Sequence, residues 1–296
     1  MIMRRYVVLA FVLIWLAGCA SGPAKKSDEQ AARPNKSTQA LRYLAWLEGT
    51  VQTDYDVDKK AIQSRLEVFR NSPPLATDVE TYLEYLSVLD ASDSARADKE
   101  IKQFAANHPG EKRLAFLLAV HYLRANKKEL AAYYFHQLEK DPHFPWKSLL
   151  YNNLGLLALK DGNRILAMDY LDRAIKATPA VAAPFVNLGA IYLHSRSYAD
   201  AGKLFVRALE IDDDFEDAAL GLGGSLEGQG KYEEAHSIYS DFIASHPNAL
   251  SALYNDSVIL GKRLKRQQEA SQQLLRYVQR GGKESARAQE MLQSWR

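Results

Sequence analysis

Few residues in this 296-residue sequence have the types and spacing that catalysis requires. The run Gly223–Gly228, GGSLEG, differs by one position from the G-x-S-x-G turn that presents a serine nucleophile. That turn must follow a strand, and this run lies in a helical pattern. Asp212, Asp214 and Glu216 alternate as calcium ligands do, but Asp217 stands where a calcium loop needs glycine. We therefore expect neither motif to be a site.

The metal-ligating residues are dispersed in the same way. The seven histidines form no H-E-x-x-H motif and no pair at i, i+4 on one helix. Cys19 is the only cysteine, which excludes a disulfide within the chain and a zinc cluster of thiolates. There is also no G-K-[ST] phosphate loop. The sequence thus predicts no catalytic residue, no metal, no cofactor and no small-molecule substrate.

The elements that would position any site are short helices in pairs. Tyr151–Pro179 has the pattern of two amphipathic helices joined by Asp161, Gly162 and Asn163. A mid-helix glycine costs about 1 kcal/mol relative to alanine, so Gly155 predicts a close approach of two helix backbones. The same pattern returns 34 residues later and again around Gly223.

The second helices carry a periodic alanine, and a large apolar residue follows each alanine four places later. The spacings between these alanines are 34, 36, 34, 34 and 35 residues, at Ala97, Ala131, Ala167, Ala201, Ala235 and Ala270. A 34-residue helix–turn–helix repeat of this kind resembles the tetratricopeptide repeat (TPR). The resemblance implies an all-α solenoid of six to seven helix pairs in a right-handed superhelix.

The resemblance divides the chain into segments. Six repeats are expected over 78–280, and 38–77 is expected to form a helical pair, either a divergent repeat or a cap. Gly281 and Gly282 break the last repeat, and Ala288, Met291 and Trp295 then share one apolar stripe. Because the end of a solenoid exposes its core, 281–296 is expected to be a C-terminal capping helix, with a frayed tail as the alternative.

In TPR proteins the first helix of each pair lines a concave groove that binds a protein or peptide. Asn153 and Asn187 match an asparagine that bonds the backbone of a bound peptide, although both could instead face water. Asp217 and Gly221 replace the bases of the co-chaperone carboxylate clamp, which disfavours that function. The positions carried over as a partner-binding groove are Asn152, Asn153, Lys160, Asn187, His194, Asn255 and Asp256.

An aromatic stretch offers a second candidate surface. Tyr133, Phe144 and Trp146 lie where the alanine spacing is 36, so two extra residues are expected to bulge from a turn. Such aromatics anchor interfaces, but core packing is the favoured interpretation.

The N-terminus has the features of a secretory signal. Arg4 and Arg5 precede eleven largely apolar residues, which are too few to span a bilayer. Leu16–Cys19 resembles the bacterial lipobox, which implies a signal peptide at 1–18, acylation of Cys19 and a flexible tether at 19–37. An ordinary signal peptide with an incidental cysteine is the alternative. Ala20 and Ser21 follow the cysteine, which favours the periplasmic face of the outer membrane over inner-membrane retention.

The net charge limits the classes of partner that the sequence predicts. The net charge is +2 and falls to zero when Arg4 and Arg5 leave with the signal, which argues against nucleic acid. The sequence therefore predicts a lipid-anchored scaffold or assembly factor for an envelope machine, resembling pilotin and pilus-assembly lipoproteins. The alternatives are an adaptor that recruits peptidoglycan hydrolases or synthases, and an enzyme with an unrecognised site.

Overall fold

The computed structural model describes residues 85–86 and 93–295. Residues 93–295 contain twelve α-helices and one π-helix, with no strand among the described residues, and the all-α expectation is confirmed for this part of the chain. The predicted signal peptide, the Cys19 anchor, the tether at 19–37 and the helical pair at 38–77 lie outside the described residues.

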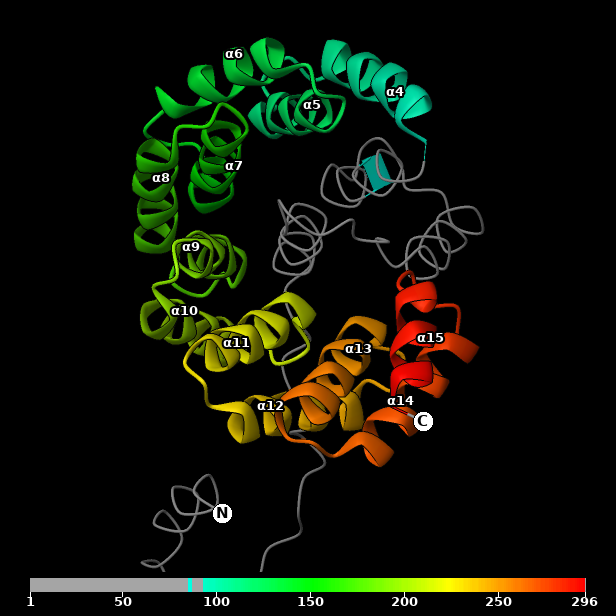
Figure 1. Ribbon diagram of the computed structural model, residues 1–296. Coiled ribbons are helices and arrows are strands. Elements are labelled where there is room, and N and C mark those ends of the chain that lie inside the picture. Colours follow the sequence, from blue (N-terminus) through cyan, green and yellow to red (C-terminus); the bar gives the residue numbers. More distant parts are fainter. Residues whose placement is uncertain (1–84, 87–92, 296) are drawn as a thin grey trace, which may run out of the picture. The chain divides into compact units, whose positions relative to one another are not determined.

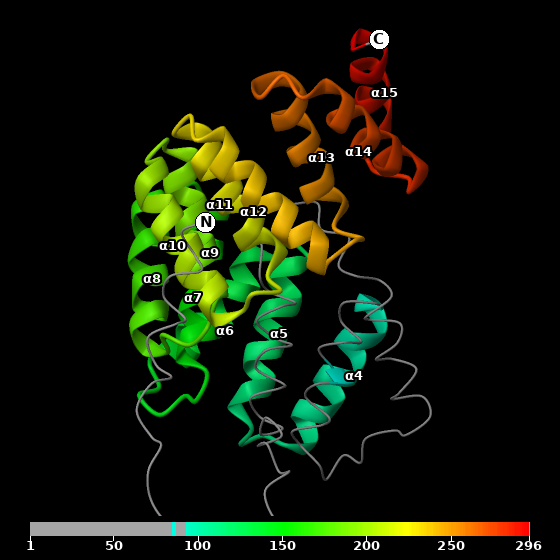
Figure 2. The same ribbon diagram turned by 90° about the horizontal axis from the view of Figure 1, so that it is seen from below.

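The helices follow one another in pairs, and Figure 1 shows each pair beside the next in sequence order. A helix packs against its partner and against the following pair, and the first helices of neighbouring pairs also touch. Figure 2 gives the same neighbours from a perpendicular direction. The elements are α4 (Ser94–Asn107), then the pairs α5 (Lys112–Arg124) and α6 (Lys128–Glu139), α7 (Lys147–Lys160) and α8 (Arg164–Ala177), α9 (Ala183–His194) and α10 (Tyr198–Ile211), α11 (Glu216–Gly228) and α12 (Tyr232–Ser245), α13 (Leu250–Val258) with the π-helix η2 (Ile259–Arg263) and α14 (Gln267–Gln279), and finally α15 (Ser285–Ser294).

The periodic alanines of the second helices are fully enclosed by this packing. All six have 0% of their surface exposed, which confirms the repeat register: Ala97, Ala131, Ala167, Ala201, Ala235 and Ala270. The large residue four places later is equally buried, for example Phe205 and Tyr239 at 1%. Each second helix thus presents a small residue and a large residue, one turn apart, to its first helix.

The glycines of the first helices receive those large residues. A Cβ atom on Gly155 would lie 2.9 Å from Leu171 Cγ, and one on Gly223 would lie 2.7 Å from the Tyr239 hydroxyl. The expected reason for the glycine, an approach of two backbones, is therefore only partly right. A backbone oxygen, that of Ala167, comes near Gly155, but the closest atoms belong to the partner's large side chain.

The two irregular spacings have separate structural causes. Between α6 and α7 the chain inserts a longer loop that turns Phe144 and Trp146 into the core, where they are 2% and 7% exposed. Their interpretation as core residues is confirmed, while Tyr133 is exposed. The 35-residue spacing coincides with η2, where one extra residue widens the end of a first helix into a π turn.

The last helix covers the end of the stack. Ala288 and Met291 of α15 are buried against the final pair, as a capping helix requires. Trp295 lies against η2, where a Cβ atom on Gly261 would come within 2.9 Å of its Cζ3. Only glycine at position 261 leaves room for this indole ring.

Candidate binding groove

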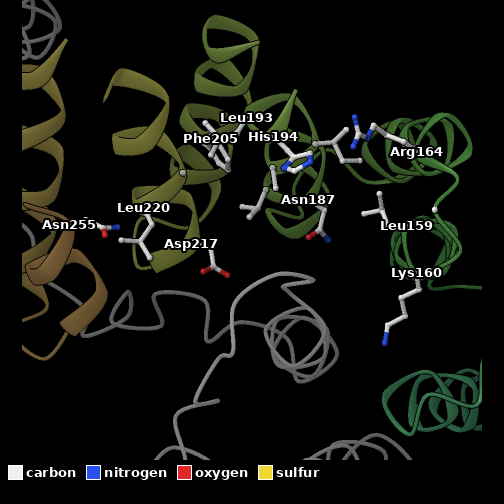
Figure 3. Close-up of a pocket in the computed structure, with 15 residues that line it drawn as sticks. Leu159, Lys160, Arg164, Asn187, Leu193, His194, Phe205, Asp217, Leu220 and Asn255 are labelled. Carbon is white, nitrogen blue, oxygen red and sulfur yellow. The ribbon is translucent and has the colours of Figure 1, made fainter. Parts of the chain in front are cut away.

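A cavity of about 470 Å³ lies on the first helices of successive pairs. Its lining comes from the end of α7, the start of α8, and α9, α11 and α13, with Phe205 of α10 beneath. Figure 3 shows the labelled side chains around this space. A ligand in this cavity would touch four consecutive repeats, so the site depends on their stacking.

Four of the seven predicted groove residues line this cavity: Lys160, Asn187, His194 and Asn255. Asn152, Asn153 and Asp256 do not, and they are 1%, 1% and 0% exposed. The first group thus lines one cavity, the second group lies inside the stack, and the role of the first group in binding a partner stays a prediction.

The buried asparagines have contacts that stabilise the first helices. Asn187 Nδ2 donates to Asn152 Oδ1 at 2.9 Å, which joins α9 to α7 across the repeat boundary. Asn153 Nδ2 donates to the Leu149 carbonyl at 2.9 Å, inside its own helix. Asn152 Nδ2 has no hydrogen-bond partner among the described residues, although it is buried. A contact between these amides and a bound peptide stays a prediction.

Asp256 belongs to a polar network that joins the last repeats. Its Oδ1 lies 2.6 Å from His236 Nδ1 of α12, and its Oδ2 accepts a hydrogen bond from Gln273 Nε2 of α14 at 2.9 Å. Ser257 Oγ lies 3.1 Å from Gln273 Oε1. A buried carboxylate requires such partners, so these contacts explain why Asp256 does not face the groove.

One side of the cavity is basic. Lys160 and His194 end their helices 34 residues apart, where the helix dipole favours positive charge, and Arg164 begins α8. All three are exposed, and no carboxylate of the described residues pairs with them. The nearby Asp161 is bound by Lys128 at 2.9 Å instead.

The floor of the cavity is apolar, and the opposite side carries one acid. Val186, Ile191 and Leu220 contribute to the floor, and Asp217 lies in the first turn of α11. Figure 3 shows Asp217 and Asn255 on the far side from Lys160 and Arg164.

The aromatic ring of Phe205 explains a gap in the asparagine column. Asn153, Asn187 and Asn255 occupy equivalent positions, but Gly221 stands at the fourth. A Cβ atom there would come within 2.6 Å of Phe205 Cδ1. The ring therefore excludes any side chain at position 221, including the base that a carboxylate clamp would need.

Sequence reasoning missed Arg164 and Phe205 as lining residues. It carried over positions of first helices only, while Arg164 follows the turn after α7 and Phe205 belongs to a second helix. The recurring turn, with Gly162 at φ 77°, could have pointed to Arg164, because it returns the chain directly beside the end of α7.

The candidate catalytic motif has no catalytic geometry. Gly223–Gly228 forms the end of α11, and Ser225 is buried with its hydroxyl donating to the Gly221 carbonyl at 2.8 Å. Within residues 85–86 and 93–295, no group of three or more His, Cys, Asp or Glu side chains could hold a metal ion. None of the helices in these ranges has the length and apolar character needed to cross a bilayer.

The family model for the tetratricopeptide repeat matches residues 82–143, 152–215 and 220–288. A curated relative, anaphase-promoting complex subunit 6 of Arabidopsis thaliana, is 31% identical over 118 residues, which cover 40% of this chain and 21% of that protein. The chain thus spans about a fifth of the length of this relative.

Solved structures share the fold at low identity. The APC/C hetero-tetramer Cut9-Hcn1 matches with a TM-score of 0.61 and 14% identity, over 90% of this chain and 50% of that chain. The pilF structure of Pseudomonas aeruginosa matches with a TM-score of 0.57 and 19% identity, over 71% of this chain and 96% of that chain. Because the family model matches more than half of the sequence, the chain belongs to the tetratricopeptide repeat family.

Proposed function

We propose that this protein is a non-catalytic scaffold that holds a segment of a partner protein in the groove formed by α7, α9, α11 and α13. The cavity on the first helices carries this proposal, because it combines an apolar floor with polar side chains at its rims. The TPR fold is generally an interaction scaffold, and the family assignment supports a protein partner rather than a small substrate.

The proposed location is the periplasmic face of a bacterial outer membrane. Its support is the sequence Leu16–Cys19, which resembles a lipobox and would place acyl chains on Cys19. Three acyl chains exceed the two-signal requirement for stable anchoring. A scaffold held there would act on a cell-envelope machine such as a pilus or a secretin.

The fold likeness to the pilF structure fits this role, but at 19% identity it concerns the fold alone. The assembly role therefore depends on the partner. Recruitment of peptidoglycan hydrolases or synthases is the alternative, and it would use the same groove.

The test is to block the groove and identify what is lost. Ala190 is half-buried in the cavity lining, so Ala190→Arg would fill the groove, while Ala199→Arg adds the same charge to an exposed position on α10 outside the lining. In cells, crosslinking of the wild type and the Ala199→Arg variant should capture a pilus or secretin subunit, and Ala190→Arg should capture none.

The folding control is circular dichroism, which should be the same for both variants. Capture of murein enzymes instead would establish the alternative. Unchanged capture by a folded Ala190→Arg variant would show that the groove is not the binding surface.

A further inference from the structure

In the part of the chain that the structure describes, no carboxylate pairs with the basic side chains of the groove, and the nearby Asp161 is bound by Lys128. Lys160, Arg164 and His194 come from three different helices and line one cavity (Figure 3). Among the described residues, Lys160 Nζ and the His194 ring have no hydrogen bond or ion pair. Within the same described residues, the Arg164 side chain donates one hydrogen bond, to the Ser195 hydroxyl at 3.5 Å.

Several basic side chains on the second helices are paired within their own helix, in contrast. Lys203 lies 2.9 Å from Asp200 on α10, and Lys102 lies 2.7 Å from Asp98 on α4. These pairs span three or four residues of one helix, so each neutralises its own surface. Lys160, Arg164 and His194 have no such partner on their own helix among the described residues, and a helix-end preference alone does not explain Arg164, which begins a helix.

We propose that the groove selects an acidic segment of its partner protein, whose carboxylates pair with Lys160, Arg164 and His194. This inference rests on the proposed function and names the chemistry of the partner. The apolar floor at Val186 and Leu220 takes the apolar side chains that flank the acidic residues. The complementary charge would speed association and exclude basic segments.

The two ends of the groove differ in charge, which predicts the orientation of the bound segment. Asp217, the one acidic side chain of the lining, lies on the α11 side, away from Lys160 and Arg164. The acidic residues of the segment therefore lie over the ends of α7 and α9, and a neutral or basic residue lies over α11.

The test is a selection that does not assume the sequence of the partner. A phage-displayed library of random twelve-residue peptides is selected on the purified full chain. It is selected in parallel on the triple variant Lys160→Ala/Arg164→Ala/His194→Ala. The matched control is Lys99→Ala/Lys140→Ala/Arg276→Ala, which removes three exposed basic residues that do not line the cavity.

The wild type and the control should enrich Asp and Glu in the selected peptides, and the triple variant should lose that enrichment. A selected peptide should bind the triple variant about tenfold more weakly by fluorescence anisotropy, since three exposed pairs each contribute only modestly. This difference should shrink as salt is raised. Replacing its acids by Asn and Gln should cause a similar loss.

Other outcomes overturn the inference. The proposal of an acidic partner is wrong if the selected peptides are not enriched in Asp and Glu, or if the triple variant selects the same acidic peptides. The inference would also be wrong if the wild type and the control bound vesicles that contain anionic phospholipid, or self-associated, and the triple variant did not. Ala190→Arg separates the two levels. If it abolishes peptide selection while the triple variant still selects the same peptides, the groove binds segments but the three basic residues do not choose them. If Ala190→Arg changes nothing, the proposed function fails as well.

Discussion

The packing of a glycine against a tyrosine can be tested with two neighbouring positions. Gly223 and Gly224 are adjacent in α11, so they share the same helix and the same intrinsic preference for alanine. A Cβ atom on Gly223 would lie 2.7 Å from the Tyr239 hydroxyl and still closer to the ring, while one on Gly224 would have Leu193 Cδ2 at 3.8 Å as its nearest atom.

The expected magnitudes follow from these distances. Alanine gains about 1 kcal/mol over glycine in a helix, and Gly224→Ala should show most of this gain because 3.8 Å is an ordinary contact. Gly223→Ala has the same gain, but it overpacks the buried Tyr239 ring at a cost of about 1–3 kcal/mol. It also displaces the Tyr239 hydroxyl from the Leu220 carbonyl, at 3.3 Å, which costs about 1 kcal/mol more.

The assay is urea unfolding followed by circular dichroism, with hydrogen exchange to localise the change. The free energy of unfolding of Gly223→Ala should be about 2–4 kcal/mol below that of Gly224→Ala. The exchange of α11 and α12 amides should increase before that of α5 and α6, because repeats are stabilised mainly by their neighbours. Equal stability of the two variants would refute the small–large pairing between first and second helices.

Three further results are expected. Glu111 caps α5 and accepts a hydrogen bond from Arg113 at 2.6 Å, and these hydrogen bonds lower the pKa of Glu111. The stabilisation by Glu111 is therefore present above the ordinary carboxyl pKa and is lost as pH falls through the lowered pKa of the folded state. Glu111→Gln should therefore lower the free energy of unfolding by about 1 kcal/mol at pH 7 and flatten its acid dependence, which chemical unfolding from pH 7 to pH 3 measures; an unchanged pH profile would count against the cap. Ala201→Trp should overpack a fully buried contact by about 1–3 kcal/mol or more, and a wild-type melting temperature would contradict the repeat register. Cys19→Ser should leave the protein either uncleaved or unanchored, which fractionation of the envelope measures, and normal outer-membrane fractionation of the variant would argue against lipidation.

The repeat register could be predicted because small and large apolar side chains recur at a fixed spacing in the sequence. Alanine and a large apolar residue recur one helical turn apart, and both are fully buried at positions such as Ala167 and Leu171. What the sequence could not show is which atoms meet. The tight contact at Gly223 is with a tyrosine ring rather than a helix backbone, and nothing in the spacing of glycines distinguishes these cases.

For the candidate groove, the sequence predicted only that the lining belongs to one face of the first helices, and not which side chains reach it. Adjacent residues on a helix differ by about 100° in direction, and polarity alone did not reveal that Asn152 and Asn153 are both buried, at 1% exposed, and outside the cavity lining. The partner that keeps Asp256 out of the groove, His236, lies on the preceding helix, twenty residues away. A single sequence has no signal for such a pair.

The π turn at Ile259–Arg263 shows how this array accommodates a change in repeat length. One additional residue is absorbed within the helix, beside a glycine that admits Trp295, and Ile259 and Leu260 remain completely buried. The extra residue therefore does not change the packing register of the next helix, α14, where Ala270 is still completely buried. Single-residue indels should accordingly be tolerated best at the end of a first helix, where a wider turn can store them locally.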